Sequence, residues 1–459
     1  MQRFNDGIMM SAWNPQPQSE LEQKLMEVAD VALDEAKRQG AGMSELSIDQ
    51  GQGMSVTVRQ GEVETVEYNR DKNLGVTVYF GHKSGSASTT DFSPDAIKSS
   101  VNSACNIAKF TEQDEFNGLA DIELLATEFP DLDLSHPWAI NMHQAIEIAT
   151  LCEDAALTGD SRISNTEGAT LSSHDGVDLY VNSNGFKGFA RGSRHSASCS
   201  VIAGQGDEMQ RDYWYDSKRY SGDLMPADEI GREAARRTIR RLDARKIKTG
   251  EHPVIFEPVV AASLLSHLIS AISGSSLYRK ASFLLDKRGQ QIFPQTVQIY
   301  EQPLLSKAAG SAVFDSEGVA TSENKIVRDG VLESYVLNCY AARKLGLKTT
   351  GNAGGVHNLT IESTVDDGLE KMIKDMGKGL VISELIGFGV NTVTGDYSRG
   401  AFGFWVENGE IQHPIQEFTI AGNLKEIFNG FVAVGSDVDE RGNIRAGSIL
   451  IEKMTVAGE

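Results

Sequence analysis

The stretch PVIFEPVVAASLLSHLISAIS, residues 253–273, predicts the centre of a domain. Its first four residues form a short apolar run that is typical of a buried strand. Pro258 suits the first turn of a helix that continues to about Ser273. That helix has apolar residues on nearly all of its faces, which predicts that it is buried. The single histidine in it, His267, either makes a hydrogen bond in the core or remains from a metal-binding helix.

The sequence after this helix predicts a large, strand-rich domain. Asp329-Gly330 and Asn408-Gly409 each separate two alternating apolar runs, which is the pattern of a tight hairpin. Further strands are expected at 380–382 and 448–455. We therefore expect residues 250–459 to form an open-barrel-like, β-rich domain around the buried helix.

The N-terminal part predicts a smaller domain of helices and antiparallel strands. Ser19 and Glu22 form a capping-box pattern for a helix that should end at Gly40, and Ser93-Pro94 opens a second helix. Three strands are expected between the helices, at 54–59, 62–68 and 74–80. We expect a flexible leader at 1–18 and an N-terminal α+β domain at 19–110.

The middle of the chain predicts a second α+β region. Residues 111–136 are acidic and lack periodicity, so they are expected to be a linker on the surface. A helix is expected from Pro137 to about Leu157, and hairpin turns at Asp175-Gly176 and Asn184-Gly185. This central region, 137–249, should end in an arginine-rich helix. The fold class is therefore α+β.

The arginine-rich helix allows two interpretations. It could contact a nucleic acid, or it could be a solvated face that balances the carboxylates of the chain. An apolar stripe that includes Ile230 and Ala234 favours the solvated face. The helix and the residues directly after it carry Arg232, Arg236, Arg237, Arg240 and Arg241.

Composition excludes some classes of function. The 459 residues include 43 Lys and Arg against 64 Asp and Glu, which gives a net charge of −21. Such a chain repels nucleic acids and anionic membranes, so we expect neither as a partner. Four cysteines without a CxxC spacing, no secretory signal and no long apolar run predict a cytoplasmic protein with reduced thiols.

Local motifs indicate no catalytic machinery. The chain has no GxxxxGK[ST], no GxSxG and no HExxH. An SxxK pattern at Ser322 lies beside a predicted hairpin rather than at a helix N-terminus, so we treat it as a chance match.

Three longer stretches resemble the TldD/PmbA family, and within it the PmbA (TldE) branch. They are SGSSLYRKASFLLDKRGQQIFP at 273–294, GVATSENKIVRDGVLESYVLNCYAARKLGLKTTGNAGG at 318–355 and GFGVNTVTGDYSRGAFGFWVENGEIQHP at 387–414. The resemblance implies a cytoplasmic, two-subunit zinc metalloprotease that acts on peptides, such as a microcin precursor or a CcdA-type antitoxin.

The resemblance also locates the metal motif of the family. The zinc-bearing TldD branch has HExxxH on the buried helix, with two histidine ligands and a glutamate base, and a cysteine ligand near the C-terminus. Here the three positions are His267, Leu268 and Ile272, and no cysteine follows Cys339. We therefore expect no catalytic residue, metal ligand set or cofactor in this chain, and zinc in a TldD-type partner.

The resemblance implies a closed chamber that admits unfolded peptides, and a peptide could bind there as an added β-strand. Two glycine-rich segments could line this chamber, although tight turns also require glycine. The candidate lining residues are Gly351, Asn352, Gly354, Gly355, Asn391, Thr394 and Asp396.

Three functions remain open on the sequence. The first is a subunit that is inactive alone and is required in a heterodimer with a TldD-type chain. The second is a peptide-binding, chaperone-like module without a proteolytic role. The third is a self-sufficient hydrolase, which the loss of HExxxH disfavours. The isolated chain could also form a homodimer.

Overall fold

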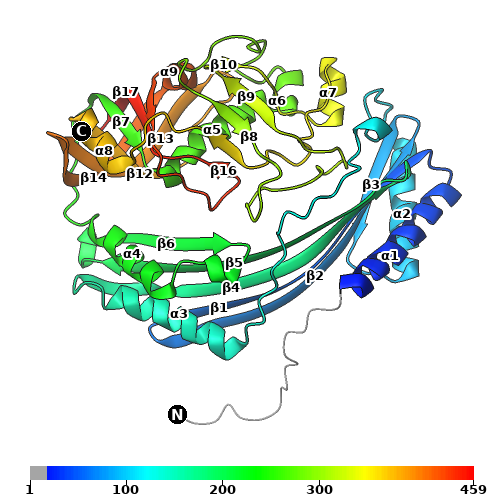
Figure 1. Ribbon diagram of the computed structural model, residues 1–459, viewed down its shortest axis with the longest axis horizontal. Helices are drawn as coiled ribbons and strands as arrows, with labels where there is room; N and C mark the ends of the chain where they lie inside the picture. The colour runs from blue at the N-terminus through cyan, green and yellow to red at the C-terminus, as the bar shows by residue number, and fades with distance from the viewer. Residues whose placement is uncertain (1–17) are drawn as a thin grey trace.

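A long curved sheet and a C-terminal unit lie opposite each other in the computed structural model, which describes residues 18–459 (Figure 1). The curved sheet has the order β3-β2-β1-β4-β5-β6, and all of its pairs are antiparallel. The mixture of helices with mainly antiparallel sheets confirms the α+β class. The expected leader lies outside the described residues, except for Gln18.

Four of the six strands in the curved sheet are unusually long. At roughly 3.3 Å per residue, a strand of 19 residues such as β2 spans about 60 Å. Strand β1 pairs with β2 on one side and β4 on the other, so the N-terminal and central regions share one sheet. The strands are β1 Met43–Arg59, β2 Glu62–Phe80, β3 Lys83–Thr89, β4 Ile163–Asn182, β5 Lys187–Ala203 and β6 Gln210–Lys218.

Two pairs of helices cover one face of this sheet. The buried residues of β1 alternate, from Leu46 and Ile48 at one end to Val56 and Val58 at the other. The first end packs against α1 and α2, and the second against α3 and α4. The helices are α1 Gln18–Arg38, α2 Pro94–Phe110, α3 Met142–Leu157 and α4 Ala227–Ile239, with short 3₁₀ turns at Ile122–Leu124, Gly206–Glu208 and Ser221–Asp223.

The hairpin predicted at Asp175-Gly176 is wrong. Strand β4 continues through both residues, and Gly176 pairs with Gly51 of β1 and Gly192 of β5. A Cβ atom at Gly51 would lie 2.8 Å from the ring of His174, so the glycine is explained by a close approach between strands. The turn at Asn184-Gly185 is confirmed, because β4 and β5 pair around it.

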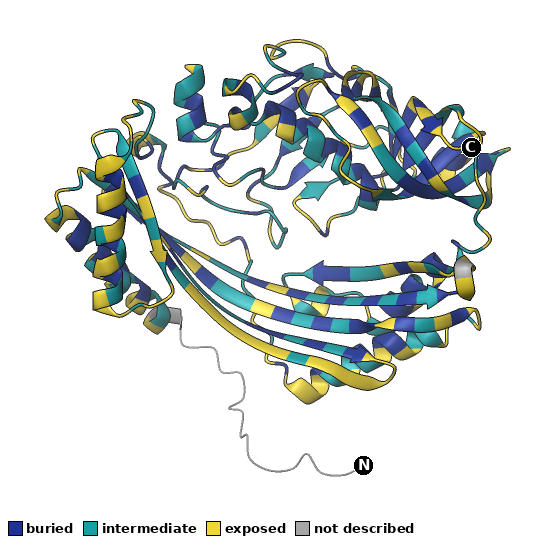
Figure 2. Cartoon of the chain, turned by 180° about the vertical axis from the view of Figure 1, so that it is seen from behind, coloured by how far each residue is buried: buried dark blue, intermediate teal, exposed yellow. Residues whose placement is uncertain are grey.

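The two strands predicted at 62–68 and 74–80 are one strand, β2. The polar residues between them lie at an open edge, because β3 pairs only with the part from Leu74 to Phe80. This edge is exposed along most of its length (Figure 2). Charged side chains on an open edge oppose pairing with other chains.

Helix α3 begins at Met142, later than predicted. Asn141 and Gln144 form a capping box, in which the Asn141 side chain accepts from the Gln144 N–H and the Gln144 side chain accepts from the Asn141 N–H. The capping box can be recognised in the sequence. The predicted start at Pro137 was wrong because proline is also common in the first turn of a helix.

The acidic segment between α2 and α3 does not lie loosely on the surface. Leu125 and Ala126 are buried, and the Ala126 N–H donates to the Gly318 carbonyl at 3.0 Å. At the other side, the Ser193 N–H of β5 donates to the Leu134 carbonyl at 2.9 Å. The segment therefore ties the sheet to the C-terminal unit.

The C-terminal unit contains a six-stranded sheet of order β14-β13-β12-β7-β17-β15 and a five-stranded sheet of order β10-β9-β8-β11-β16. The hairpins predicted at Asp329-Gly330 and Asn408-Gly409 are confirmed, with positive φ at all four residues. The larger sheet comprises β7 Gly250–Phe256, β12 Gly379–Ile386, β13 Asp396–Glu407, β14 Glu410–Asn423, β15 Phe431–Val434 and β17 Ile449–Ala457. The smaller comprises β8 Ile299–Glu301, β9 Asn324–Arg328, β10 Val331–Leu332, β11 Leu359–Ile361 and β16 Ile444–Arg445. The helices are α5 Pro258–Ile272, α6 Gly274–Tyr278, α7 Cys339–Leu345, α8 Leu369–Met376 and α9 Leu424–Asn429.

The arginines of α4 and the turn after it do not all form a solvated face. Arg237 and Arg241 are buried, and Glu257, also buried, accepts two hydrogen bonds from Arg240 at 2.9 and 3.1 Å. Arg241 donates to Glu384 of β12 at 2.6 Å. These contacts join α4 to the C-terminal unit, while Arg232 and Arg236 pair with acids on the outer face of the helix.

Between residues 18 and 459, no helix is long and apolar enough to cross a membrane. The four cysteines are free thiols, and all are buried.

Candidate functional site

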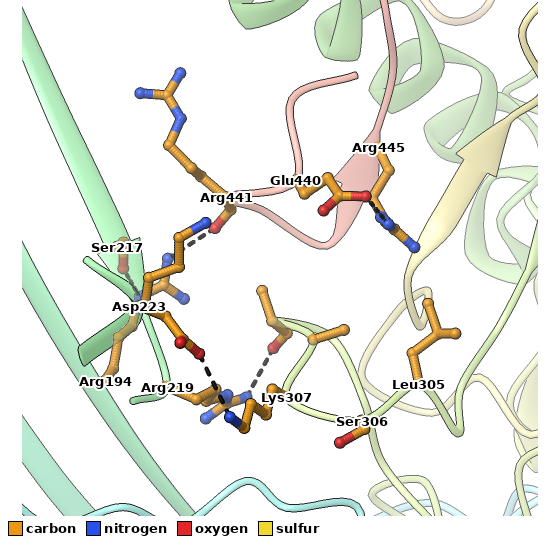
Figure 3. Close-up of a pocket in the computed structure, with 13 residues that line it drawn as sticks. Arg194, Ser217, Arg219, Asp223, Leu305, Ser306, Lys307, Glu440, Arg441 and Arg445 are labelled. Carbon is orange, nitrogen blue, oxygen red and sulfur yellow. Dashed lines mark hydrogen bonds and ion pairs between the residues drawn. The ribbon is translucent and has the colours of Figure 1, made fainter. Parts of the chain in front are cut away.

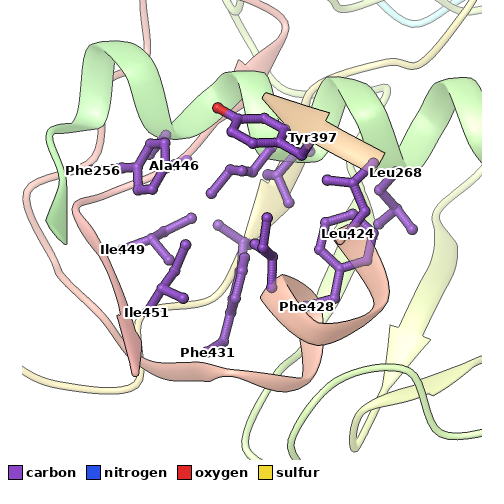
Figure 4. Close-up of a cluster of buried hydrophobic side chains, with 14 of the residues drawn as sticks. Phe256, Leu268, Tyr397, Leu424, Phe428, Phe431, Ala446, Ile449 and Ile451 are labelled. Atoms are coloured by element: carbon purple, nitrogen blue, oxygen red, sulfur yellow. The ribbon is translucent and has the colours of Figure 1, made fainter. Parts of the chain in front are cut away.

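The helix predicted to be buried, α5, lies at the centre of the C-terminal core. Leu268 and Ile272, which stand where the family motif has its glutamate and second histidine, are both 0% exposed. Figure 4 shows Leu268 in the same cluster as Tyr397, Leu424 and Phe428. A charged or metal-bound side chain at either position would have to replace apolar packing.

His267, at the first position of the motif, has a different environment. It is half-buried, and its ring lies 5.9 Å from the ring of Tyr397 in an edge-on arrangement. Its Nε2 is buried without a hydrogen-bond partner. Burial lowers the pKa of His267, and the positive charge of Arg399 lowers it further, so the neutral imidazole is favoured.

The donor set at this position does not fit a zinc ion. A catalytic zinc needs three protein ligands in addition to water, and Leu and Ile have no donor atom. Within residues 18–459, no three His, Cys, Asp or Glu side chains are grouped so that they could hold a metal ion. The free Nε2 of His267 is therefore one donor at a place where a catalytic zinc site needs three.

The first group of candidate chamber residues, 351–355, forms a tight turn beside the smaller sheet. Gly351, Gly354 and Gly355 have φ of 70°, 98° and 121°, which favours glycine. Asn352 is buried, and its Nδ2 donates to Glu301 at 2.9 Å. Burial raises the pKa of Glu301, although hydrogen bonds from the His357 N–H and from Asn352 oppose this.

The second group forms an exposed turn that precedes β13. Asn391 accepts from the N–H of Val393 at 2.9 Å, and Thr394 donates to Asp396 at 2.6 Å. The Thr394 hydroxyl, together with Asn423, lowers the pKa of Asp396. The turn reaches the neighbourhood of α5 because the Phe283 N–H donates to the Thr392 carbonyl at 2.9 Å.

The structure therefore places the two groups on different sheets. The turn at 351–355 has its polar contacts with Glu301 and Asp315, and the turn at 391–396 has its contacts with Asn423 and Phe283. Positive φ explains the glycines at 351–355, and these hydrogen bonds account for the polar side chains of both turns. Lining of a chamber by these residues stays a prediction.

A polar face of the curved sheet was missed from the sequence. The face opposite the helices carries hydroxyl side chains that pair across strands, with 2.9 Å between Ser55 and Ser172 and between Thr57 and Thr170. These four hydroxyl residues are only half-buried. Along β5 the same face continues through Ser200, Ser198 and Ser196, because their neighbours Cys199 and Ala197 point into the helix-covered core. The signal was present as alternation of Ser or Thr with apolar residues in β1, β4 and β5.

This hydroxyl-lined face is the one that meets the C-terminal unit. A cavity of about 630 Å³ lies between Ser47, Thr77 and Ser86 of the sheet and Ser316 and Glu317 of the C-terminal unit. The surface can hydrogen-bond the backbone of an extended chain without demanding particular side chains.

Comparison with known proteins identifies the chain. Three family models match in sequence order: PmbA/TldA metallopeptidase domain 1 at residues 44–108, the central domain at 135–242 and the C-terminal domain at 249–458. Metalloprotease PmbA of Escherichia coli O157:H7 is 49% identical over 96% of this chain and 98% of its own length. The metalloprotease PmbA homolog of Haemophilus influenzae is 45% identical over 95% of this chain and 97% of its own length.

Solved structures have the same fold. A putative modulator of DNA gyrase from Bacteroides thetaiotaomicron matches with a TM-score of 0.90 and 29% identity, over 95% of this chain and 99% of that one. TldE from Thermococcus kodakarensis matches with a TM-score of 0.82 and 21% identity, over 94% of this chain and 100% of that one. From these matches over nearly the whole length, the chain belongs to the PmbA/TldD family of metallopeptidases, in its PmbA branch.

Proposed function

We propose that this chain is the subunit without zinc in a two-subunit metallopeptidase, and that a TldD-type partner supplies the zinc ion. The observation that carries the proposal is the complete burial of Leu268 and Ile272 at two of the three motif positions. Neither side chain can bind zinc or accept a proton, which supports a reaction that takes place on the partner.

The role of this chain is then to hold peptides for its partner. The hydroxyl groups on this face of the sheet can donate hydrogen bonds to peptide backbone groups and accept hydrogen bonds from them. Such bonds do not depend on the side chains of the peptide. Such binding favours unfolded peptides, since a folded protein has already paired its backbone groups. The four buried free thiols are consistent with work in the reducing cytoplasm.

The test is to purify this chain alone, the TldD-type partner alone and the mixture. Zinc per subunit and cleavage of an unfolded peptide are measured for each sample. We expect zinc in the partner only, cleavage by the mixture, and loss of cleavage when the glutamate of the partner's HExxxH is changed to glutamine. Stoichiometric zinc and cleavage by this chain alone would overturn the proposal.

A variant of this chain tests whether His267 of α5 takes part in metal binding. His267→Ala should leave cleavage by the mixture nearly unchanged, because no group of three His, Cys, Asp or Glu ligands includes His267 among the described residues. Loss of both zinc and cleavage in the mixture would show that His267 is a metal ligand.

A second candidate is a peptide-binding module without a proteolytic role, which the hydroxyl-lined face also favours. It predicts that the mixture binds unfolded peptides and never cuts them. Cleavage that requires both subunits would support the peptidase subunit and contradict the binding module.

A further inference from the structure

A positively charged cleft lies where the curved sheet meets two loops of the C-terminal unit (Figure 3). Its volume is about 400 Å³. The sheet contributes Arg194 of β5 and the end of β6, and the opposite side comes from loops around Lys307 and Arg441. We call it the arginine cleft, and its charged lining residues are Arg194, Lys218, Arg219, Asp223, Lys307, Glu440, Arg441 and Arg445.

The cleft is unusual for its excess of positive charge in a chain of net charge −21. Some of its cations are already paired. Arg441 donates two hydrogen bonds to Asp439 at 2.9 and 2.8 Å, Arg445 pairs with Glu440, and Lys307 lies 3.5 Å from Asp223.

Arg194 and Arg219 have no carboxylate partner among the described residues. Arg194 donates to the Ser217 hydroxyl at 2.8 Å and to the Arg441 carbonyl at 3.3 Å. Arg219 donates to the carbonyls of Ser193 at 3.3 Å and Ala309 at 2.8 Å, and its Nε is buried without any partner. All of these acceptors are neutral, so both guanidinium charges remain uncompensated.

The two guanidinium groups also act on each other. Burial lowers the pKa of Arg219, and the neighbouring positive charge of Arg194 lowers it further. Two like charges close together raise the free energy of the cleft, and a bound anion would lower it. Gly192 leaves room for this arrangement, because a Cβ atom there would lie 2.8 Å from Nη1 of Arg219.

The cleft is continuous with the hydroxyl-lined face. Ser200, Ser198, Ser196 and Arg194 are alternate residues of β5, so they lie on one face of the strand. Ser217, which accepts from Arg194, is paired with Ser196 on the neighbouring strand β6. An extended chain that follows this row of hydroxyl groups reaches the two arginines at its end.

We propose that the arginine cleft binds the carboxylate of a peptide, with Arg194 and Arg219 as its ligands and the rest of the peptide along the hydroxyl row of β5. The planar fork of a guanidinium group matches the two oxygens of a carboxylate. This inference rests on the proposed function, since it assumes that peptides are what the chain holds. The carboxylate comes from the C-terminus of the peptide or from Asp and Glu side chains.

The experiment uses three versions of one unfolded, otherwise uncharged peptide with a fluorophore at its N-terminus. One has a free C-terminal carboxylate, one a C-terminal amide, and one the amide with a single internal glutamate. Fluorescence anisotropy with the full chain gives the Kd of each. We expect the free acid to bind at least ten-fold more tightly than the amide, and Arg194→Gln to abolish the difference.

Arg211→Gln is the matched control. It removes the same charge from the neighbouring strand β6, but Arg211 is exposed, pairs with Glu167 and lies outside the cleft lining. This variant should retain the preference for the free acid. Arg194 is itself exposed, so Arg194→Gln tests the cleft without a large effect on folding.

The outcomes separate the possibilities. Equal affinity for acid and amide in the unchanged chain, or equal loss in the two variants, would overturn the proposal. Tight binding of the glutamate-containing amide would support the cleft and assign side-chain carboxylates as a source. Binding of inorganic phosphate at the cleft without any peptide preference would overturn it.

The proposed function can fail separately. In the mixture with the TldD-type subunit, the inference predicts a KM for the free acid about ten-fold below that for the amide, at similar kcat. No cleavage of either peptide would contradict the proposed function, while the anisotropy measurement would still decide the arginine cleft.

Discussion

Helix α5 and the arginine cleft represent opposite uses of polar chemistry in one chain. At α5, Leu268 and Ile272 occupy the positions of the family's glutamate base and second histidine, and both are fully buried and contribute to the core. In the arginine cleft, two guanidinium groups lack the carboxylates that would stabilise them, beside a cavity of about 400 Å³. The difference shows two ways in which a site can depart from full pairing: apolar side chains remove the need for polar partners at α5, whereas unpaired cations leave a surface that can attract an anion.

The largest loss of stability is expected when a charge is placed in the buried helix α5. Leu268→Glu should lower the free energy of unfolding by about 3–5 kcal/mol, because an unpaired carboxylate would replace apolar contacts in the core. Urea denaturation measures the loss. Ser270→Glu on the exposed side of the same helix should change stability by less than about 0.5 kcal/mol. Full stability of Leu268→Glu with added zinc would show that the site accepts metal.

A smaller loss is expected where two arginines share one buried carboxylate. Glu257→Gln should cost about 3 kcal/mol, because it leaves Arg237 and Arg240 without their shared carboxylate at a buried contact. Glu229→Gln, at an exposed position of α4, is the control and should be nearly neutral. Equal effects of the two variants would show that the contact between α4 and the C-terminal unit adds little to stability.

The histidine of α5 should make a modest, pH-dependent contribution. Its folded pKa lies below the ordinary value of 6.5, so on acidification the unfolded chain takes up a proton first. Stability from neutral His267 is therefore complete above pH 6.5 and is lost as the pH falls towards the folded pKa.

The measurement is the Tm of the unchanged chain and of His267→Leu between pH 7.5 and 5.5. The Tm of the variant should fall less on acidification than the Tm of the unchanged chain. The difference between the two falls belongs to His267, because other histidines with a lowered pKa, such as His195, are present in both proteins. Parallel curves for the two proteins would contradict this assignment.

The smallest effect on folding is expected in the arginine cleft. Arg194→Gln should change the free energy of unfolding by no more than about 0.5 kcal/mol, because it removes an uncompensated charge from a half-open surface. Urea denaturation of this variant beside Glu257→Gln compares an unpaired arginine with a paired one. A loss as large as that of Glu257→Gln would make Arg194 a structural residue.

Turns and helices were the most predictable parts of the fold. The hairpins predicted at Asp329-Gly330 and Asn408-Gly409 are in the structure, because both residues of each turn have positive φ, which Asp-Gly and Asn-Gly favour. At Asp175-Gly176 the same signal was misleading. Gly176 meets glycines on both neighbouring strands, and that requirement depends on pairing with distant residues.

The site was predictable only in part. The apolar character of α5 and the replacements at Leu268 and Ile272 could be seen in the sequence. The arginine cleft could not, because Arg194, Arg219, Lys307 and Arg441 lie far apart in the chain and meet only after the sheet packs against the C-terminal unit. The buried arginines near α4 were missed for the same reason, since their partners Glu257 and Glu384 belong to other elements.

The pairing of β1 with both β2 and β4 has a consequence for synthesis on the ribosome. The β1–β2 hairpin closes locally, but Val56 of β1 pairs with Leu171 of β4, more than a hundred residues later. Until that later strand emerges, one edge of β1 has free backbone donors and acceptors, which other chains can pair with. The nascent protein is therefore most vulnerable to aggregation during this interval, and binding of chaperones to β1 should end when β4 is made.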